Sequence, residues 1–380
     1  MFINWIIIIG VIIFSAAIIT VSYRVKGKKK FKKIKSKGKQ LELERSPKNP
    51  ILKPRREKHW DSEGAFNPAA VEVDGTTHLL YRAVGNDGVS RVGHASMKDG
   101  VNIDERSEFP VYEPSVNFDL VDEYDVNDPK KYDPQFYTSG GSWGGFEDPR
   151  AVQIGGRIYM TYVNFGGWSS VRIALTSISV RDFKKKIWNW RKPVFLSPAG
   201  EVNKNWVLFP EKINGKYAIL HSVAPKVLVD YVDNLEHFPR GFRIKSSAQH
   251  GGYGYQDKKR EKFWDNHVRG AGAPPLKTEL GWLLLYHAVD KKDPGKYKVG
   301  AMILDLKNPT KVLYRGIAPI LSPKMHYEND GKPGVVYASG AVINRDRLFV
   351  YYGGGDRNVC VAETSLKKLL IWLTEHGKVS

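Results

Sequence analysis

Five stretches of the chain share one pattern of polar and apolar positions. In each, a turn containing proline or glycine leads into an aliphatic run, a tight polar turn follows, and a second apolar run ends in an aromatic residue or a histidine. Apolar strands joined by a tight turn predict a β-hairpin in each copy. The copies are Phe66–Ala83, Phe146–Asn164, Phe209–Ser222, Ala273–Ala288 and Ser339–Gly354.

The spacing of the copies predicts how they assemble. Their terminal residues, at positions 81, 162, 221, 286 and 351, are separated by 81, 59, 65 and 65 residues. A repeat of this length is typical of a blade, and one blade cannot bury both of its faces. We therefore expect an all-β fold in which five blades close into a five-bladed β-propeller. The ends of the inner strands would then converge on a central channel.

The composition agrees with many short strands joined by turns. Of the 380 residues, 42% are hydrophobic and 12% aromatic, and there are 36 glycines and 21 prolines. One amphipathic helix is expected near the C-terminus, over residues 365–373. The single cysteine, Cys360, excludes a disulfide framework and agrees with a reducing compartment.

The N-terminal segment differs from the rest of the chain. Residues 2–23 carry no charge and are mostly aliphatic, and about 20 apolar residues can cross a bilayer as a helix. No basic residue precedes this run and a basic block follows it, which favours an uncleaved anchor over a cleaved signal peptide. We therefore predict a single transmembrane helix over 1–23, a basic juxtamembrane linker over 24–48 and the propeller over 49–380.

Most of the positive charge lies beside that apolar segment. The formal net charge is +19; residues 24–58 hold 16 basic and 3 acidic side chains, a net of +13, so the remainder carries +6. A basic segment next to a membrane span holds its side in the cytoplasm and contacts anionic lipid. We therefore expect a single-pass membrane protein with a cytoplasmic globular domain, anionic lipid as a partner and no nucleic acid. The sequence indicates no oligomeric state.

Only the second copy places an acidic pair, Glu147 and Asp148, at the start of its inner strand. The proline after Asp148 favours an extended backbone, and the two preceding glycines let another group approach closely. A carboxyl group at the channel is suited to act as a general acid. The alternative is structural: Asp148 forms a local turn, as Asn67 would before its proline in the first copy, and Glu147 pairs with Arg150.

Other polar residues occupy matched positions at the strand ends. Arg82, His287 and Tyr352 each follow the terminal aromatic residue of a copy, and Asp356 lies on a glycine-rich turn beyond the fifth copy. Gathered at one end of a channel, these side chains would offer hydrogen bonds to a polyhydroxylated ligand. The alternative is that they are ordinary structural and turn residues.

A basic group in the third and fourth copies is a candidate anion site. Lys204, Lys212 and His267 would suit phosphate if they lie near Asp148, and surface charge in a basic protein is the alternative reading. With one cysteine and no histidine pair at ligand spacing, we expect no metal. The sequence has no phosphate-binding loop, dinucleotide-binding glycine pattern or serine nucleophile elbow, so we expect no cofactor.

Taken together, the motifs resemble glycoside hydrolase family 130, which contains β-mannoside phosphorylases and related mannosidases and has five-bladed propellers. The resemblance covers residues 49–372. It rests on Phe-Asn-Pro-Ala-Ala at 66–70, Leu-Leu-Tyr-Arg-Ala at 79–83, Ser-Arg-Val-Gly at 90–93, Glu-Asp-Pro-Arg at 147–150, Leu-Phe-Pro-Glu-Lys at 208–212, Gly-Ala-Gly-Ala-Pro-Pro at 270–275 and Tyr-Tyr-Gly at 351–353.

The resemblance implies a glycoside phosphorylase. Asp148 would be the catalytic general acid, and inorganic phosphate, as co-substrate, would cleave a β-mannoside oligosaccharide to α-mannose 1-phosphate with inversion. Combining the resemblance with the positions above, we predict substrate contacts from Asn67, Arg82, Arg91, Glu147, Arg150, His287, Tyr352 and Asp356. We predict phosphate contacts from Lys212, Lys204 and His267.

Two alternatives remain open. A hydrolase of the same family would need a second carboxylate to activate water, for which Glu113, Glu211 and Glu328 are the candidates. A membrane-tethered propeller without turnover would bind carbohydrate only. The long segment over 101–142 is expected to form a lid or a loop on the acceptor side.

Overall fold

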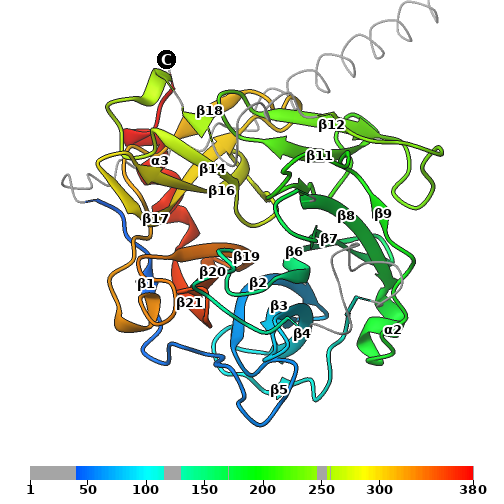
Figure 1. Cartoon of the computed structure of the whole chain (residues 1–380). Coiled ribbons are helices and arrows are strands. Elements are labelled where there is room, and N and C mark those ends of the chain that lie inside the picture. The colour runs from blue at the N-terminus through cyan, green and yellow to red at the C-terminus, as the bar shows by residue number, and fades with distance from the viewer. Residues whose placement is uncertain (1–39, 115–129, 170, 246–254, 257, 380) are drawn as a thin grey trace, which may run out of the picture. The chain divides into compact units, whose positions relative to one another are not determined.

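The computed structural model describes residues 40–114, 130–169, 171–245, 255–256 and 258–379, and these are mostly β-strand (Figure 1). The strands form four hydrogen-bonded sheets. The eight-stranded sheet contains β2 (Gly64–Val73), β3 (Thr76–Val84), β4 (Val89–Met97), β5 (Glu105–Arg106), β6 (Gly144–Ile154), β7 (Arg157–Phe165), β8 (Val171–Ser179) and β9 (Val194–Phe195). The three-stranded sheet contains β10 (Val207–Leu208), β11 (Tyr217–Ser222) and β12 (Leu228–Val232).

The other two sheets come from the C-terminal half and the N-terminal strand. The six-stranded sheet contains β13 (Tyr255–Gln256), β14 (His267–Ala271), β15 (Leu276–Thr278), β16 (Gly281–Asp290), β17 (Asp293–Leu304) and β18 (Val312–Arg315). The four-stranded sheet contains β1 (Glu44–Arg45), β19 (Val336–Asn344), β20 (Arg347–Gly354) and β21 (Asn358–Ser365). The helices are α2 (Val180–Lys184) and α3 (Leu366–His376), with short 3-10 turns η2 (Lys258–Arg260) and η3 (His326–Glu328).

Each of the five sequence repeats contributes to an antiparallel strand pair; in the third, the partner strand β10 lies just before the copy. The pairs are β2–β3, β6–β7, β10–β11, β15–β16 and β19–β20. Asp74 and Gly75, which join the first pair, have φ values of 48° and 75°, the left-handed conformation that two-residue hairpin turns favour. The expected C-terminal helix is α3, whose N-cap Ser365 accepts a hydrogen bond from the amide of Lys368 at 3.1 Å.

The predicted all-β fold of five separate blades is wrong. Repeats one and two share the eight-stranded sheet because the start of β6, in the second repeat, is hydrogen-bonded to β4. Ser90 on β4 pairs in parallel with Gly145 on β6. A Cβ atom at Gly145 would lie 2.3 Å from the carbonyl oxygen of Ser90, so this contact depends on glycine. The described residues therefore form a mostly β fold of four sheets with two α-helices.

The predicted membrane anchor and most of the basic linker lie outside the described residues. Within the described part of the chain, no helix is long and apolar enough to cross a membrane. The fold prediction is corrected accordingly, and the cytoplasmic location and lipid contact stay predictions. The folded unit begins at Gln40 and takes in residues 40–48, which the sequence assigned to the linker. Leu41 and Leu43 are buried there, and β1 pairs with β21.

The buried apolar side chains of the described residues gather between neighbouring repeats. Four clusters join repeats that follow one another in the sequence. A fifth cluster, which includes Tyr81 and Phe349, joins the first repeat to the last. Because burial of one large apolar side chain contributes about 1.5–3 kcal/mol, these clusters hold the repeats together and fix the positions of their inner ends.

The terminal tyrosines of repeats one and four have matching structural roles. The Tyr81 hydroxyl donates a hydrogen bond to Asp61 at 3.2 Å, and the Tyr286 hydroxyl donates to Asp265 at 2.6 Å. In both repeats an arginine also donates to the carboxylate. A buried hydroxyl requires a partner, so these tyrosines anchor the strands to buried acids and do not reach a ligand.

Candidate functional site

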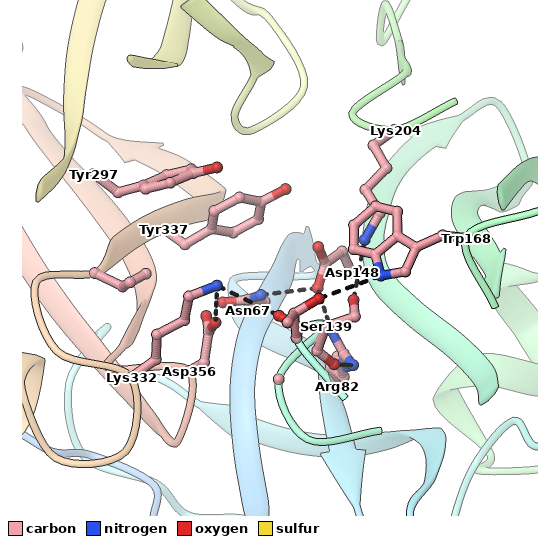
Figure 2. A pocket seen from close by; sticks show the side chains of 13 residues that line it. Asn67, Arg82, Ser139, Asp148, Trp168, Lys204, Tyr297, Lys332, Tyr337 and Asp356 are labelled. Atoms are coloured by element: carbon pink, nitrogen blue, oxygen red, sulfur yellow. Dashed lines mark hydrogen bonds and ion pairs between the residues drawn. The ribbon is translucent and has the colours of Figure 1, made fainter. Parts of the chain in front are cut away.

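The inner ends of the repeats meet at Arg150, on β6. Its guanidinium group donates hydrogen bonds to the carbonyl oxygen of Gly272 at 2.7 Å, to the Asn205 side chain at 3.2 Å and to the Tyr337 hydroxyl at 3.1 Å. A cavity of about 180 Å³ lies beside this junction (Figure 2). It is lined by Asn67, Arg82, Thr138, Ser139, Gly140, Asp148, Trp168, Lys204, Tyr297, Lys332, Val335, Tyr337 and Asp356.

Asp148 and Asn67 enter the cavity from equivalent β-bulges. The pairing register of β6 with β7 shifts across Asp148, and that of β2 with β3 shifts across Asn67. Their φ values are 48° and 46°, so the extended backbone expected before proline is not found. Aspartate and asparagine tolerate this left-handed conformation better than most residues, and a bulge redirects a side chain. As a result, Asn67 Nδ2 donates to Asp148 Oδ1 at 2.8 Å.

Glu147 is a fully buried carboxylate that positions two cations of the site. Its Oε1 accepts a hydrogen bond from Arg82 at 2.9 Å, and its Oε2 accepts from Lys204 at 2.9 Å and from the Ser139 hydroxyl at 3.0 Å. Arg82 also donates to the carbonyl oxygen of Ser139 at 2.7 Å and lies 3.5 Å from Asp148 Oδ1. Glu147, which is itself fully buried, therefore holds Arg82 and Lys204 next to Asp148.

A second group of buried side chains supports Asp148 from behind. Arg150 Nη1 donates to the backbone carbonyl oxygen of Asp148 at 2.6 Å. The Tyr337 hydroxyl bonds with the Asn205 side chain, and the His287 ring stacks on Tyr337 with centroids 4.1 Å apart and planes 8° from parallel. Burial, aided by Arg150, lowers the pKa of His287 to about 3, so this ring is neutral near pH 7.

The two carboxyl groups that line the cavity have pKa values shifted in opposite directions. Burial acts to raise the pKa of Asp148, but the nearby cations, Arg82 and Lys204 foremost, outweigh it and the pKa is lowered. Burial raises the pKa of Asp356, and the opposing effect of Lys332, whose Nζ lies 3.7 Å from the carboxylate, offsets it only in part. Asp356 therefore holds a proton more readily than Asp148.

Five of the eight predicted sugar contacts do not line the cavity. Arg91 pairs with Asp87 at 2.7 Å. Tyr352 is fully buried in the core, where its hydroxyl donates to Glu328 at 2.8 Å. Glu147, Arg150 and His287 lie behind the cavity wall, whereas three of the predicted residues, Asn67, Arg82 and Asp356, line the cavity.

Of the three predicted phosphate contacts, only Lys204 lines the cavity. Lys212 is exposed, and its ammonium group lies 4.5 Å from the centre of the Tyr217 ring. His267 begins β14 and is partly buried away from the cavity lining. Lys332 instead provides a second lysine, and Figure 2 shows it across the cavity from Lys204.

Several lining residues were not indicated by the sequence. Ser139, Trp168 and Lys332 lie in loops outside the repeats, where no periodic pattern marks them. Tyr337 lies at the start of β19, the inner strand of the fifth repeat. Tyr337 lies two residues before the fifth copy as the sequence defined it, so alignment of the copies did not reach this residue.

Comparisons with known proteins agree on one family. A sequence profile of glycoside hydrolase family 130, described as beta-1,4-mannooligosaccharide phosphorylase, matches residues 134–375. The 1,2-beta-oligomannan phosphorylase of Thermoanaerobacter sp. (strain X514) is 34% identical over 342 residues, covering 87% of this chain and 99% of that protein. The beta-1,4-mannooligosaccharide phosphorylase of Ruminococcus albus is 31% identical over 245 residues, covering 62% of this chain and 68% of that protein.

A solved structure supports the same fold. The beta-1,2-mannobiose phosphorylase from Listeria innocua, in complex with beta-1,2-mannobiose, aligns with a TM-score of 0.63 and 23% sequence identity. The alignment covers 88% of this chain and 100% of that chain. At 23% identity, the similarity to this solved structure supports the fold alone. Membership of the family rests on the profile and on the relatives with higher identity. The chain therefore belongs to glycoside hydrolase family 130.

Proposed function

We propose that this protein is a β-mannoside phosphorylase, which uses inorganic phosphate to cleave a β-mannoside and releases α-mannose 1-phosphate. Membership of a family whose named relatives are phosphorylases supports this function. The observation that carries it is the composition of the cavity: carboxyl groups of Asp148 and Asp356 together with Arg82, Lys204 and Lys332. A carboxyl group in the cavity can protonate the oxygen of the leaving sugar, and the cations beside it can bind an anionic nucleophile.

In the proposed reaction, Asp148 protonates the oxygen of the leaving sugar while phosphate attacks the anomeric carbon from the opposite face. Asn67, Arg82 and Asp356 hold the mannose unit. Phosphate is already an anion at neutral pH, so its attack requires positioning by cations and no protein base. Lys204 is the predicted phosphate ligand that lines the cavity, and we add Lys332.

The lowered pKa of Asp148 fits this reaction because bound phosphate would raise it again. Arg82 and Lys204 are the cations that chiefly stabilise the ionised carboxylate. A bound phosphate would neutralise part of their charge and add negative charge nearby, and both effects raise the pKa of a carboxyl group. Phosphate binding therefore favours the protonated form of Asp148 that a general acid requires.

Hydrolysis is the weaker alternative because, within the described part of the chain, none of the three bases that the sequence suggested lines the cavity. The three sequence candidates lie elsewhere: Glu113 is exposed, Glu211 pairs with Lys277, and Glu328 is fully buried in the core. Among the described residues that line the cavity, the second carboxyl group is Asp356, and burial raises its pKa. A raised pKa does not prevent a carboxyl group from acting as a base, so Asp356 is the candidate base of the hydrolytic alternative.

The test is phosphate dependence of the full-length protein. Beta-1,2- and beta-1,4-linked mannobiose are incubated with and without phosphate, and mannose and mannose 1-phosphate are measured separately. We expect mannose 1-phosphate to form only when phosphate is present. Release of two mannose units regardless of phosphate would establish a hydrolase, and tight binding of sugar without turnover would establish a carbohydrate-binding protein.

A pair of lysine variants tests the phosphate site. Lys204→Met should raise the KM for phosphate strongly, because the Lys204 side chain is only 7% exposed and lines the cavity. Lys212→Met should leave that KM nearly unchanged, because Lys212 is exposed and away from the cavity lining. The reverse ranking would restore the sequence-based assignment of Lys212 and contradict the geometry.

A further inference from the structure

A second cavity of about 210 Å³ adjoins the first. The two share three lining residues, Thr138, Ser139 and Trp168. Asp148 lines only the first cavity, and the second contains no carboxylate among its lining residues. The second cavity is therefore a neighbouring compartment without the acid that cleavage requires.

Trp168 stands at the boundary of the two cavities and is 45% exposed, which is unusual for so large an apolar side chain. Its indole nitrogen donates a hydrogen bond to the Thr138 hydroxyl at 3.2 Å, and its ring meets Phe165 edge-to-face with centroids 5.6 Å apart. Lys204 Nζ lies 5.0 Å from the ring centre. These contacts hold the indole in place while much of its surface stays available for contact, as Figure 2 shows beside Lys204.

The remaining wall of the second cavity is rich in aromatic side chains. Phe136, Tyr137 and Trp143 come from the segment just before β6, and Phe165 ends β7. The cationic lining residue is Lys130, whose Nζ lies 5.3 Å from the centre of the Trp143 ring. An aromatic wall with hydroxyl and backbone groups suits a neutral ring that has apolar C–H faces and polar edges, which describes a pyranose. It is less suited to a free phosphate ion.

We propose that the second cavity is the binding site for the leaving sugar, and that Trp168 is the platform on which this sugar stacks. This inference rests on the proposed phosphorylase function, in which the mannose next to Asp148 occupies the first cavity. The sugar beyond the cleaved bond must then enter an adjoining space. Because its wall lies in the segment before β6, this part of the chain determines which acceptor the enzyme uses.

The reverse reaction tests the proposal, since it presents the two sugars as separate substrates. With α-mannose 1-phosphate as donor and mannose or mannobiose as acceptor, Trp168→Ala should raise the KM for the acceptor by about tenfold, the upper range of one aromatic contact. The KM for α-mannose 1-phosphate should change less than about twofold by the same scale. Trp168→Phe should recover most of the acceptor affinity.

Two further variants separate binding from folding. Phe136→Ala removes a ring from the second cavity and should also raise the acceptor KM, whereas Phe109→Ala, which removes a similarly exposed ring that lines neither cavity, should not. Equal changes in donor and acceptor KM, or a change in the phosphate KM alone, would overturn the assignment.

A binding experiment keeps this inference separate from the proposed function. If the native protein shows no turnover, calorimetry with mannobiose on the native protein and on Trp168→Ala still reports the site. A loss of mannobiose affinity in Trp168→Ala would support the sugar platform even in a non-catalytic protein. Unchanged affinity would refute the platform, whatever the outcome of the phosphate assay.

Discussion

Replacement of Glu147 by glutamine tests whether this buried carboxylate organises the site. The substitution preserves shape and removes one negative charge. In the native protein that charge accepts hydrogen bonds from Arg82 and Lys204, both at 2.9 Å, and Glu147 has no exposed surface. The variant leaves Arg82 and Lys204 largely buried without this counterion, and Asp148, 3.5 Å from Arg82, is the carboxylate that stays beside them.

The expected magnitude follows from these contacts. A hydrogen bond to a charged group contributes about 1.5–3 kcal/mol, and removing one partner of a buried ion pair costs about 3–5 kcal/mol. We therefore expect Glu147→Gln to lower the free energy of unfolding by about 3–5 kcal/mol. The control is Glu363→Gln on the surface: Glu363 pairs with Arg347 at 2.7 Å but is a third exposed, so its loss should cost less than about 1 kcal/mol.

The assay is urea unfolding followed by tryptophan fluorescence and circular dichroism, with both variants measured under the same conditions. A loss in Glu147→Gln no larger than that in Glu363→Gln would refute the reasoning. Activity gives a second readout. In Glu147→Gln the charge that offsets Arg82 and Lys204 is gone, so these cations should lower the pKa of Asp148 further. Asp148 should then lose its proton at a lower pH, and the decline of activity with rising pH should begin at a lower pH than in the native enzyme.

Three further predictions concern catalysis, acid stability and packing. Asp148→Asn should reduce kcat by about 10²–10⁴-fold without unfolding the protein, and retained activity would remove Asp148 from the general-acid role. Burial lowers the pKa of His94 to about 3, below its unfolded value near 6.5, so the unfolded chain binds the proton first. His94 should therefore contribute a loss of stability of about 1.4 kcal/mol per pH unit as the pH falls from 6.5 to 3, and His94→Gln should lack this contribution while the one from His287 remains. Gly300→Ala would place a Cβ atom 2.5 Å from Cζ of Tyr286 and should cost about 1–3 kcal/mol in thermal or urea unfolding, whereas Gly295→Ala, with no atom within 4 Å, should be nearly neutral.

The repeats made part of the site predictable. Asn67 and Asp148 lie on bulges of β2 and β6. Arg82 lies near the end of β3, and Asp356 lies just beyond β20. Because the repeats pack in a closed order, these positions meet at one cavity. The same logic placed Tyr352 there, but its side chain points into the core. Adjacent residues of a strand face opposite sides of the sheet, and matched spacing alone did not decide which side faces the ligand.

The rest of the site comes from loops and from long-range contacts. Ser139, Trp168 and Lys332 have no repeat position, and no local pattern links them to Asp148. Lys212 shows the opposite case, since its motif matches the family but its side chain lies over Tyr217 at the surface. The conformation of a loop depends on the residues against which it packs, and local sequence patterns do not identify those residues.

By itself, the sequence determined the family, the five hairpins and the residue types for acid, sugar and anion contacts, because these depend on local patterns and on motifs. The tertiary structure decided that repeats one and two share a sheet through Gly145, and that Asp148 adopts a left-handed bulge. It also decided that the pKa values of Asp148 and Asp356 shift in opposite directions. Each of these depends on which distant groups come within a few ångströms, a property that only the folded chain has.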